Sequence, residues 1–211
     1  MWAVIGRSEE SIDYEAYFPH RYHEEEFESD GFVQPFCDTP LDEEVVGEDV
    51  YLNIINKAKK YVYICTPYLI IDNEMMTALC LAAKSGVDVR IMTPGIPDKK
   101  LVFILTQSYY RQLLEAGVKI YWYQKGINHS KVIIVDGSVA SVGTANMDLR
   151  SFEQNFEVSL IIYDREVVKK LAVDFMKDLK VSTEGAIQRW KFRTKREKVC
   201  ESVARLFAPV L

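Results

Sequence analysis

The sequence predicts an α/β fold in which a mixed β-sheet is sandwiched between helices, and three observations lead to this prediction. From Gly47 onward, short apolar runs with strand character alternate three times with longer segments of helical period. Glycine or proline follows these segments, as at Gly86, Pro94 and Gly117. After residue 128 the pattern changes to short strands joined by a tight turn, which indicates antiparallel pairing.

The region from residue 47 to residue 123 supplies the parallel part of this sheet. Its first helix is indicated by apolar residues on one helical face and by lysines in the last turn, at positions 57, 59 and 60. The remaining predicted elements are a strand at 61–65, a helix at 73–83, a strand at 87–92, a helix at 101–116 and a strand at 118–123. Because helices connect these strands, we expect them to pair in parallel.

The region after residue 128 supplies the antiparallel part. Strands are predicted at 129–135 and 139–143, joined by the turn sequence Asp136-Gly137-Ser138. A strand at 156–163, a helix at 166–179 and a basic helical segment at 184–206 follow. The domain organisation predicted from these patterns is an acidic connector at 1–46, an α/β domain at 47–183 and a basic helical tail at 184–211.

The composition is that of an ordinary globular protein, with 48% apolar and 27% charged residues. The longest mostly apolar stretch, 61–71, is too short to span a membrane, and the N-terminus lacks a signal peptide pattern. The four cysteines show no CxxC spacing, which favours reduced thiols. We therefore expect this chain itself to be soluble and cytoplasmic.

Charge is distributed unevenly along the chain. Residues 1–50 contain 15 acidic side chains and two arginines, so the remainder carries a balance of +8 although the whole chain has a net charge of −5. A basic domain behind an acidic segment suits an anionic partner. That partner can be a phospholipid headgroup, a nucleic acid or a small phosphate ester, and charge alone does not choose among them.

A group of polar residues in the antiparallel part is suited to phosphoryl transfer. In a strand, residues i and i+2 share a face, so His129 and Lys131 are expected to project together. The returning strand brings back Thr144 and Asn146, whose hydroxyl and amide can donate to phosphate oxygens. Glu157 can accept the proton of the second imidazole nitrogen and so fix its tautomer.

Each residue of this group has an ordinary alternative explanation. A single histidine at the start of a strand is usually a surface or core residue, and Thr-x-Asn after glycine is usually turn chemistry. Asp136 lies at a turn, where a carboxylate commonly bonds to the backbone. The joint spacing is what is specific: HxKxxxxD, then Gly-Thr-x-Asn seven residues past the aspartate, then an acid eleven residues past the asparagine.

With these residues the sequence resembles the phospholipase D superfamily, whose signature is HxKxxxxD (the HKD motif) followed by G-[ST]-x-N. Within it, the chain is similar to the C-terminal half of bacterial cardiolipin synthases, from about Asp30 to the end. The segments that carry the similarity are DGFVQPFCDTPLDEE, CTPYLIIDNEM, TPGIPDKK, HSKVIIVDG, GTANMDLRSF, NFEV and ESVARLFAPVL. The resemblance implies a catalytic set of His129, Lys131, Asp136 and Glu157, with Asp136 mainly structural, and phosphate binding by Lys131, Thr144 and Asn146.

The resemblance also implies a reaction and its partners. The expected reaction is transfer of a phosphatidyl group between two phosphatidylglycerol molecules through a phosphohistidine, giving cardiolipin and glycerol without metal or cofactor. In-line displacement needs two histidines, so a second HKD half must come from the N-terminal half of a parent chain or from a second copy. Relatives carry two motifs and membrane spans, so we expect this chain to be a fragment of a protein of the bacterial cell membrane. The alternative is a single-motif homodimeric phosphodiesterase or nuclease; the main interpretation involves no nucleic acid.

Several weaker signals leave alternatives open. Tyr68 is either a site residue or a buried aromatic, and Lys99 belongs either to a loop at the mouth of the site or to a basic helix start. Trp190 and Phe192, among basic residues, either rest on an anionic membrane surface or pack against the domain. The remaining histidines, His20 and His23, lie in the acidic connector, where a solvated loop is the favoured interpretation over cation binding.

Overall fold

A computed structural model describes residues 13–18, 21, 31–41, 44–206 and 208. The chain divides into two units, Met1–Asp30 and Gly31–Leu211. Within the described part of the first unit, a single turn of 3-10 helix covers Tyr14–Tyr17. His20 and His23 of that unit lie outside the described residues.

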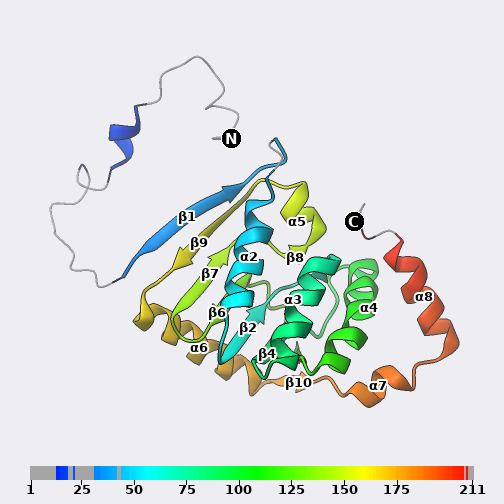
Figure 1. Cartoon of the computed structure of the whole chain (residues 1–211). Helices are drawn as coiled ribbons and strands as arrows, with labels where there is room; N and C mark the ends of the chain where they lie inside the picture. Colours follow the sequence, from blue (N-terminus) through cyan, green and yellow to red (C-terminus); the bar gives the residue numbers. More distant parts are fainter. Residues whose placement is uncertain (1–12, 19–20, 22–30, 42–43, 207, 209–211) are drawn as a thin grey trace. The chain divides into compact units, whose positions relative to one another are not determined.

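The second unit is built on an eight-stranded sheet with the order β1-β9-β7-β6-β2-β4-β5-β10 (Figure 1). The strands β2, β4 and β5 pair in parallel, and every other neighbouring pair in the sheet is antiparallel. The predicted mixed sheet is therefore confirmed. The strands are β1 (Val33–Asp38), β2 (Tyr61–Cys65), β4 (Asp88–Pro94), β5 (Lys119–Tyr123), β6 (Val132–Val135), β7 (Val139–Gly143), β9 (Glu157–Ile162) and β10 (Ser182–Glu184).

Helices cover both faces of the sheet. On one face lie α2 (Val46–Lys57), α3 (Asn73–Lys84) and α4 (Lys100–Ala116), and α6 (Arg165–Leu179) lies on the other (Figure 1). The helix ends follow from local chemistry: Asp72 accepts a hydrogen bond from the Met75 N–H at the start of α3, and Gly117 ends α4 in the left-handed conformation. Alternate residues of β6 serve the two cores, since Ile133 packs with the α2–α4 layer and Ile134 with α6.

The strand β1 corrects the predicted connector boundary at residue 46. It pairs with β9 along six residues, from Val33 opposite Ile162 to Asp38 opposite Glu157. It is an edge strand, and an edge tolerates Pro35, which lacks an N–H to donate. The proline and the weak alternation of apolar and polar residues are not typical of a strand, so the sequence pattern predicted a linker here. The structure shows that residues 33–38 belong to the sheet.

The C-terminal segment was predicted to be helical, and it contains α7 (Ile187–Lys191) and α8 (Lys195–Arg205) after β10. The membrane-anchor alternative for Trp190 is wrong. The Trp190 side chain is 1% exposed, its ring stacks on Tyr110 with a centroid distance of 5.7 Å, and the Arg193 guanidinium lies 4.0 Å from its ring centroid. Phe192, by contrast, is 85% exposed. One aromatic of the pair is therefore a core residue and the other a surface residue.

The described residues contain no helix that is both long and apolar enough to cross a membrane. The four cysteines are free thiols, with Cys65 and Cys80 buried and Cys37 and Cys200 exposed. Burial raises the pKa of Cys65 to about 12, so this thiol stays protonated and packs as an apolar side chain.

Candidate functional site

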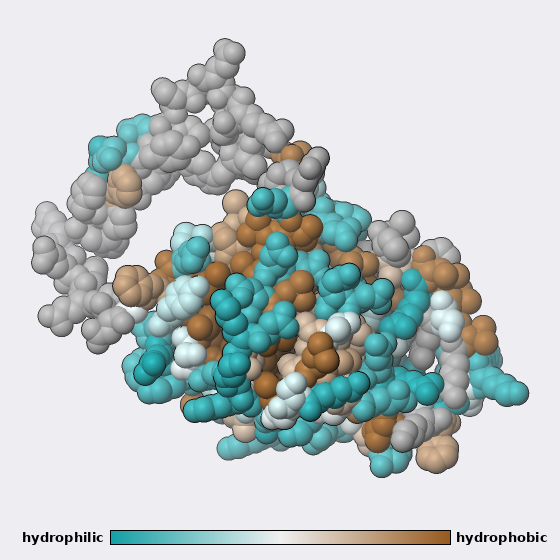
Figure 2. Space-filling view, in the orientation of Figure 1, coloured by the Kyte–Doolittle hydropathy of each residue, from teal (hydrophilic) through white to brown (hydrophobic). Residues whose placement is uncertain are grey.

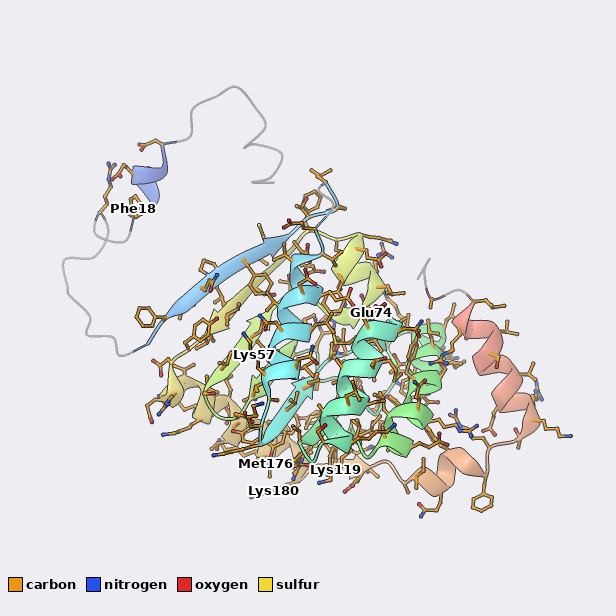
Figure 3. The ribbon with its side chains drawn as sticks, viewed as in Figure 1. Phe18, Lys57, Glu74, Lys119, Met176 and Lys180 are labelled. Carbon is orange, nitrogen blue, oxygen red and sulfur yellow. The ribbon has the colours of Figure 1, made fainter. Side chains whose placement is uncertain are left out.

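The candidate site lies at the edge of the sheet where β2 and β4 end. His129 and Lys131 precede β6, whose first residue, Val132, is paired with Cys65, the last residue of β2. The opposite edge of the sheet is marked by Lys119 at the start of β5, near Met176 and Lys180 (Figure 3). Because loops from several strands meet at the carboxyl edge, residues distant in sequence gather there.

His129 and Lys131 form a direct pair. The Lys131 ammonium lies 2.7 Å from His129 Nδ1 and 2.8 Å from the His129 carbonyl oxygen, to which it donates. The predicted strand begins only at Val132, so the two side chains meet across a loop rather than along a strand. Partial burial lowers the pKa of Lys131, against the opposing effect of the Glu157 and Asp148 carboxylates. An ammonium can only donate, so the short contact with Nδ1 is one in which the imidazole accepts.

Thr144 takes part in strand pairing. Its hydroxyl accepts a hydrogen bond from the Val158 N–H at 3.0 Å and donates to the Val158 carbonyl at 3.3 Å. Glycine is required just before it, because a Cβ on Gly143 would overlap the Ser159 side chain. Thr144 therefore contributes to the shape of the site through the β7–β9 pair, and its predicted contact with phosphate stays a prediction.

Asn146 points its amide at a partly empty space. Its Nδ2 donates to Ser151 Oγ at 3.2 Å, and its backbone N–H donates to the same oxygen at 3.1 Å. Its Oδ1 is buried and, within the described part of the chain, has no hydrogen-bond partner. Asp148, which is 6% exposed, holds Ser151 in place by accepting the Ser151 N–H at 2.7 Å, and burial raises the pKa of Asp148.

A small parallel pair, β3 (Leu69–Ile70) with β8 (Met147–Asp148), links this segment to the end of β2. The Thr66 hydroxyl joins both sides, since it donates to the Tyr68 carbonyl at 2.6 Å and accepts from the Met147 N–H at 3.0 Å. Neither β3, β8 nor the short helix α5 (Leu149–Glu153) was predicted. Two-residue strands leave no readable period in a sequence.

Tyr68 is a half-buried aromatic that packs against the core and also lies beside His129, so the structure supports both interpretations that the sequence left open. Its ring meets the His129 ring edge-on, with a centroid distance of 6.4 Å. Its hydroxyl donates to the Asp98 carboxylate, and the Lys99 ammonium lies 5.8 Å from the same ring. Asp98 and Lys99 therefore lie beside Tyr68, and Lys99 is at the same time the residue that precedes helix α4.

Glu157 is 8% exposed and accepts a hydrogen bond from Asn155 Nδ2 at 3.0 Å. It was predicted to orient a histidine, and that role stays a prediction. Its carboxylate does act on the site electrostatically, because it favours the charged form of Lys131.

A pocket of about 280 Å³ opens beside the histidine–lysine pair. It is lined by Tyr68, Ile70, Lys99, Val102, Asn146, Asp148, Arg150, Ser151 and Asn155. Four of these, Asp148, Arg150, Ser151 and Asn155, were missed by the sequence analysis. The segment GTANMDLRSF contains three of them and carries part of the family resemblance, but it does not show that α5 folds back over the asparagine.

Asp136 lies at the other end of β6, in the turn to β7. Its carboxylate accepts three backbone N–H groups, from Lys59 at 2.7 Å and from Lys60 and Tyr61 at 2.8 Å. Asp136 itself has φ of 54° and Gly137 of 65°, as a type I′ hairpin turn requires. The Asp136 carboxylate was predicted to bond to the backbone, and it does. Its partners, however, are not in its own turn but just before and at the start of β2, so the bonds hold the β6–β7 hairpin against β2. Its inclusion in a catalytic set is not supported by this position.

The described residues contain no group of three or more His, Cys, Asp or Glu side chains arranged to hold a metal ion. Besides the carboxylates of Asp98, Asp148 and Glu157, the polar groups at the site are an imidazole, cations, amides and hydroxyls. Such groups suit an anionic ligand with oxygen atoms on its surface.

Comparison with known proteins agrees with this geometry. The family described as cardiolipin synthase, PLD-like domain, matches residues 51–179. The chain is 45% identical to a cardiolipin synthase of Geobacillus sp. (strain WCH70) over 185 residues, which cover 88% of this chain and 37% of the relative. This chain thus spans less than half the length of the curated relatives it matches.

Two solved structures share the fold. Nuc, a phospholipase D family member from Salmonella typhimurium, aligns with a TM-score of 0.63 at 20% identity, covering 74% of this chain and 99% of that chain. The phosphatidylserine synthase of Haemophilus influenzae Rd KW20 aligns with a TM-score of 0.68 at 16% identity, covering 85% of this chain and 48% of that chain. At these identities the likeness concerns the fold alone. Together with the family match over more than half of the sequence, it places this chain in the phospholipase D-like family of cardiolipin synthase domains.

Proposed function

We propose that this chain supplies one of two half-sites for phosphatidyl transfer between two phosphatidylglycerol molecules, giving cardiolipin and glycerol. The observation that carries the proposal is the His129–Lys131 pair, which adjoins a polar pocket reached by Asn146. The 45% identity to a cardiolipin synthase supports the choice of reaction.

The chemistry requires two imidazoles. One attacks the phosphorus of the first phosphatidylglycerol, so that an N–P bond forms while the P–O bond to the headgroup glycerol breaks. The second, on the opposite side, donates its proton to the departing glycerol oxygen. It then accepts the proton of the terminal hydroxyl of a second phosphatidylglycerol, whose oxygen attacks phosphorus and releases the first imidazole.

Lys131 and Asn146 serve the phosphate in this proposal. When an anionic oxygen takes the Lys131 ammonium, His129 Nδ1 loses its donor and the imidazole is free to change tautomer. Asn146 lines the same pocket, and its amide has a second N–H besides the one that donates to Ser151 Oγ. In this proposal the second N–H donates to a phosphate oxygen.

The second imidazole must come from outside this chain's own HKD motif. The chain spans 37% of the Geobacillus relative, so a longer parent has room for a second half of this size. A second copy of this chain is the other source. In both cases the two halves meet with their histidines on opposite sides of one phosphorus.

An anionic membrane surface is the proposed location of the reaction, since the acyl chains stay in lipid. The exposed residues that suit such a surface are Phe192, Lys195 and Arg196, together with Val199 and Val203 on α8. Figure 2 shows hydrophobic and hydrophilic residues side by side on the face of the molecule in view. Each cation near an anionic membrane contributes about 1 kcal/mol to binding.

A nuclease or phosphodiesterase working as a homodimer is the second candidate, and the single motif per chain favours it. The two candidates differ in substrate. The decisive experiment incubates the chain, alone and with an N-terminal half of a related synthase, with phosphatidylglycerol micelles and with DNA. We expect cardiolipin and glycerol as products, whereas cleavage of DNA without conversion of phosphatidylglycerol would replace the main proposal by the second.

The phosphate-binding roles lead to a prediction for Lys131→Ala and Asn146→Ala. Each substitution removes one preorganised donor to the phosphate, so each is expected to lower turnover by about 10²-fold. Turnover of fluorescent phosphatidylglycerol by the assembled protein measures this. The matched control is Lys125→Ala, an exposed lysine of the same loop, which should retain activity. Wild-type rates in both variants would remove these residues from the site.

A further inference from the structure

The pocket beside His129 has the size of a lipid headgroup. Its volume is about 280 Å³. Pockets that hold drug-sized ligands have about 300–1,000 Å³. A phosphoglycerol group therefore suits the pocket, whereas the acyl chains of a phospholipid would have to remain outside it.

The pocket contains cations that the donor phosphate does not require. Lys99 and Arg150 line it, and within the described part of the chain neither forms an ion pair with a carboxylate. The nearby acids are engaged elsewhere: Asp148 is buried against the Ser151 N–H, and Asp98 accepts the Tyr68 hydroxyl and the Lys99 N–H. Two cations on a polar pocket can hold a phosphate.

The pocket also contains a buried polar atom that needs a partner. One end of the Asn146 amide is bonded to Ser151, and the other end is buried without a partner among the described residues. The NH₂ end also faces the Asp148 carboxylate, which fixes the amide with its oxygen as the unpartnered end. An unpaired buried polar atom costs about 1–3 kcal/mol, so a polar ligand atom at this position would be favourable.

Tyr68 connects the pocket to His129. The Tyr68 ring contacts both the His129 ring, at 6.4 Å between centroids, and the Lys99 ammonium, at 5.8 Å. In cardiolipin a single glycerol separates the two phosphates. The phosphate of the accepting lipid must therefore bind within one glycerol length of the reacting phosphorus, and Tyr68, which lines this pocket, is also a neighbour of His129.

We infer that this pocket binds the phosphoglycerol headgroup of the accepting phosphatidylglycerol, an inference that rests on the proposed function. Lys99 and Arg150 hold the acceptor's phosphate, and the Asn146 amide directs its glycerol toward the phosphohistidine. Water, the competing acceptor, has no phosphate group that Lys99 and Arg150 could bind. The pocket thus favours transfer to a lipid hydroxyl over hydrolysis to phosphatidic acid.

The first test compares products of the Lys99→Ala/Arg150→Ala double variant with those of Lys100→Ala, a neighbouring exposed lysine that does not line the pocket. In an active assembly, the double variant should lower the ratio of cardiolipin to phosphatidic acid at least about tenfold, because loss of acceptor binding slows transfer and leaves hydrolysis by water unaffected. Lys100→Ala should leave the ratio unchanged. An unchanged ratio in the double variant, or an equal fall in both products, would overturn the inference.

The second test uses the chain alone and needs no turnover. Glycerophosphoglycerol, the deacylated headgroup, is titrated calorimetrically into wild-type chain and both variants. We expect its dissociation constant to rise at least about tenfold in the double variant and to stay unchanged in Lys100→Ala. If no assembly converts phosphatidylglycerol, the proposed function fails and this titration still decides the pocket. Absence of wild-type binding, or equal binding by the double variant, would refute the assignment.

Discussion

Replacement of His129 by alanine is expected to lower phosphatidyl transfer at least about 10⁴-fold in any active assembly, because removal of one member of a catalytic unit costs nearly as much as removal of all. In the proposed reaction His129 is either the attacking nitrogen or the group that protonates the departing glycerol. Neither Lys131 nor Tyr68, its neighbours in the structure, can replace an imidazole in those roles. Release of glycerol from labelled phosphatidylglycerol measures the effect.

The fold should not respond to this substitution. His129 is exposed and belongs to neither hydrophobic cluster of the domain. The circular dichroism spectrum and the melting temperature of His129→Ala should therefore match those of the wild type. Wild-type turnover in a folded His129→Ala protein would refute the assignment of the whole site, including the roles proposed for Lys131 and Asn146.

The parallel half of the fold was predictable because its hydrophobic pattern is long and regular. In α4, the buried residues Leu105, Tyr109 and Leu113 recur at helical spacing, and Gly117 ends the helix. The strand Tyr61–Cys65 matches the prediction at both ends. Burial on both faces of the sheet imposes such patterns, so sequence and structure agree there.

The elements that escaped prediction are those whose burial depends on distant partners. The edge strand β1 pairs only with β9 within the sheet. Most of its residues are exposed, so its sequence does not show the alternation of apolar and polar residues that predicts a strand. Trp190 looked like an interfacial aromatic because basic residues flank it, although its ring fills a space between Tyr110 and Arg193. Packing against α4 determines that Trp190 is buried, and the composition of the neighbouring residues does not indicate this packing.

The site was predictable to the extent that spacing fixes it. His129 and Lys131 were expected together and are together, although the reason given, a shared strand face, does not apply to a loop. Ser151 and Asn155 could not be found in this way. Their positions depend on the pairing of β8 with β3 and on the fold of α5, which bring them back toward Asn146 and Glu157.

Asp136→Ala is expected to lower the free energy of unfolding by about 3–5 kcal/mol, since three hydrogen bonds to a charged acceptor are lost at a partly buried position. The carboxylate joins the β6–β7 turn to the end of α2 and the first residue of β2, Tyr61. Burial alone would raise the pKa of Asp136, but the Tyr61, Lys59 and Lys60 N–H groups together lower it. A lowered carboxyl pKa stabilises the fold above the ordinary aspartate range. This contribution should be lost as the pH falls through the lowered pKa, and in Asp136→Ala it should be absent at every pH.

Urea unfolding at neutral pH and at acidic pH tests this, with Asp174→Ala as the matched control. Asp174 is an acid whose exposed side chain pairs with Lys177 on α6, so its removal should cost less than about 1 kcal/mol. The same two variants separate structure from catalysis. Asp136 lies at the end of β6 remote from His129, so the folded fraction of Asp136→Ala should turn over a soluble phosphodiester at the wild-type rate. A variant with unchanged stability and a turnover reduced by about 10²-fold or more would instead make Asp136 part of the chemistry.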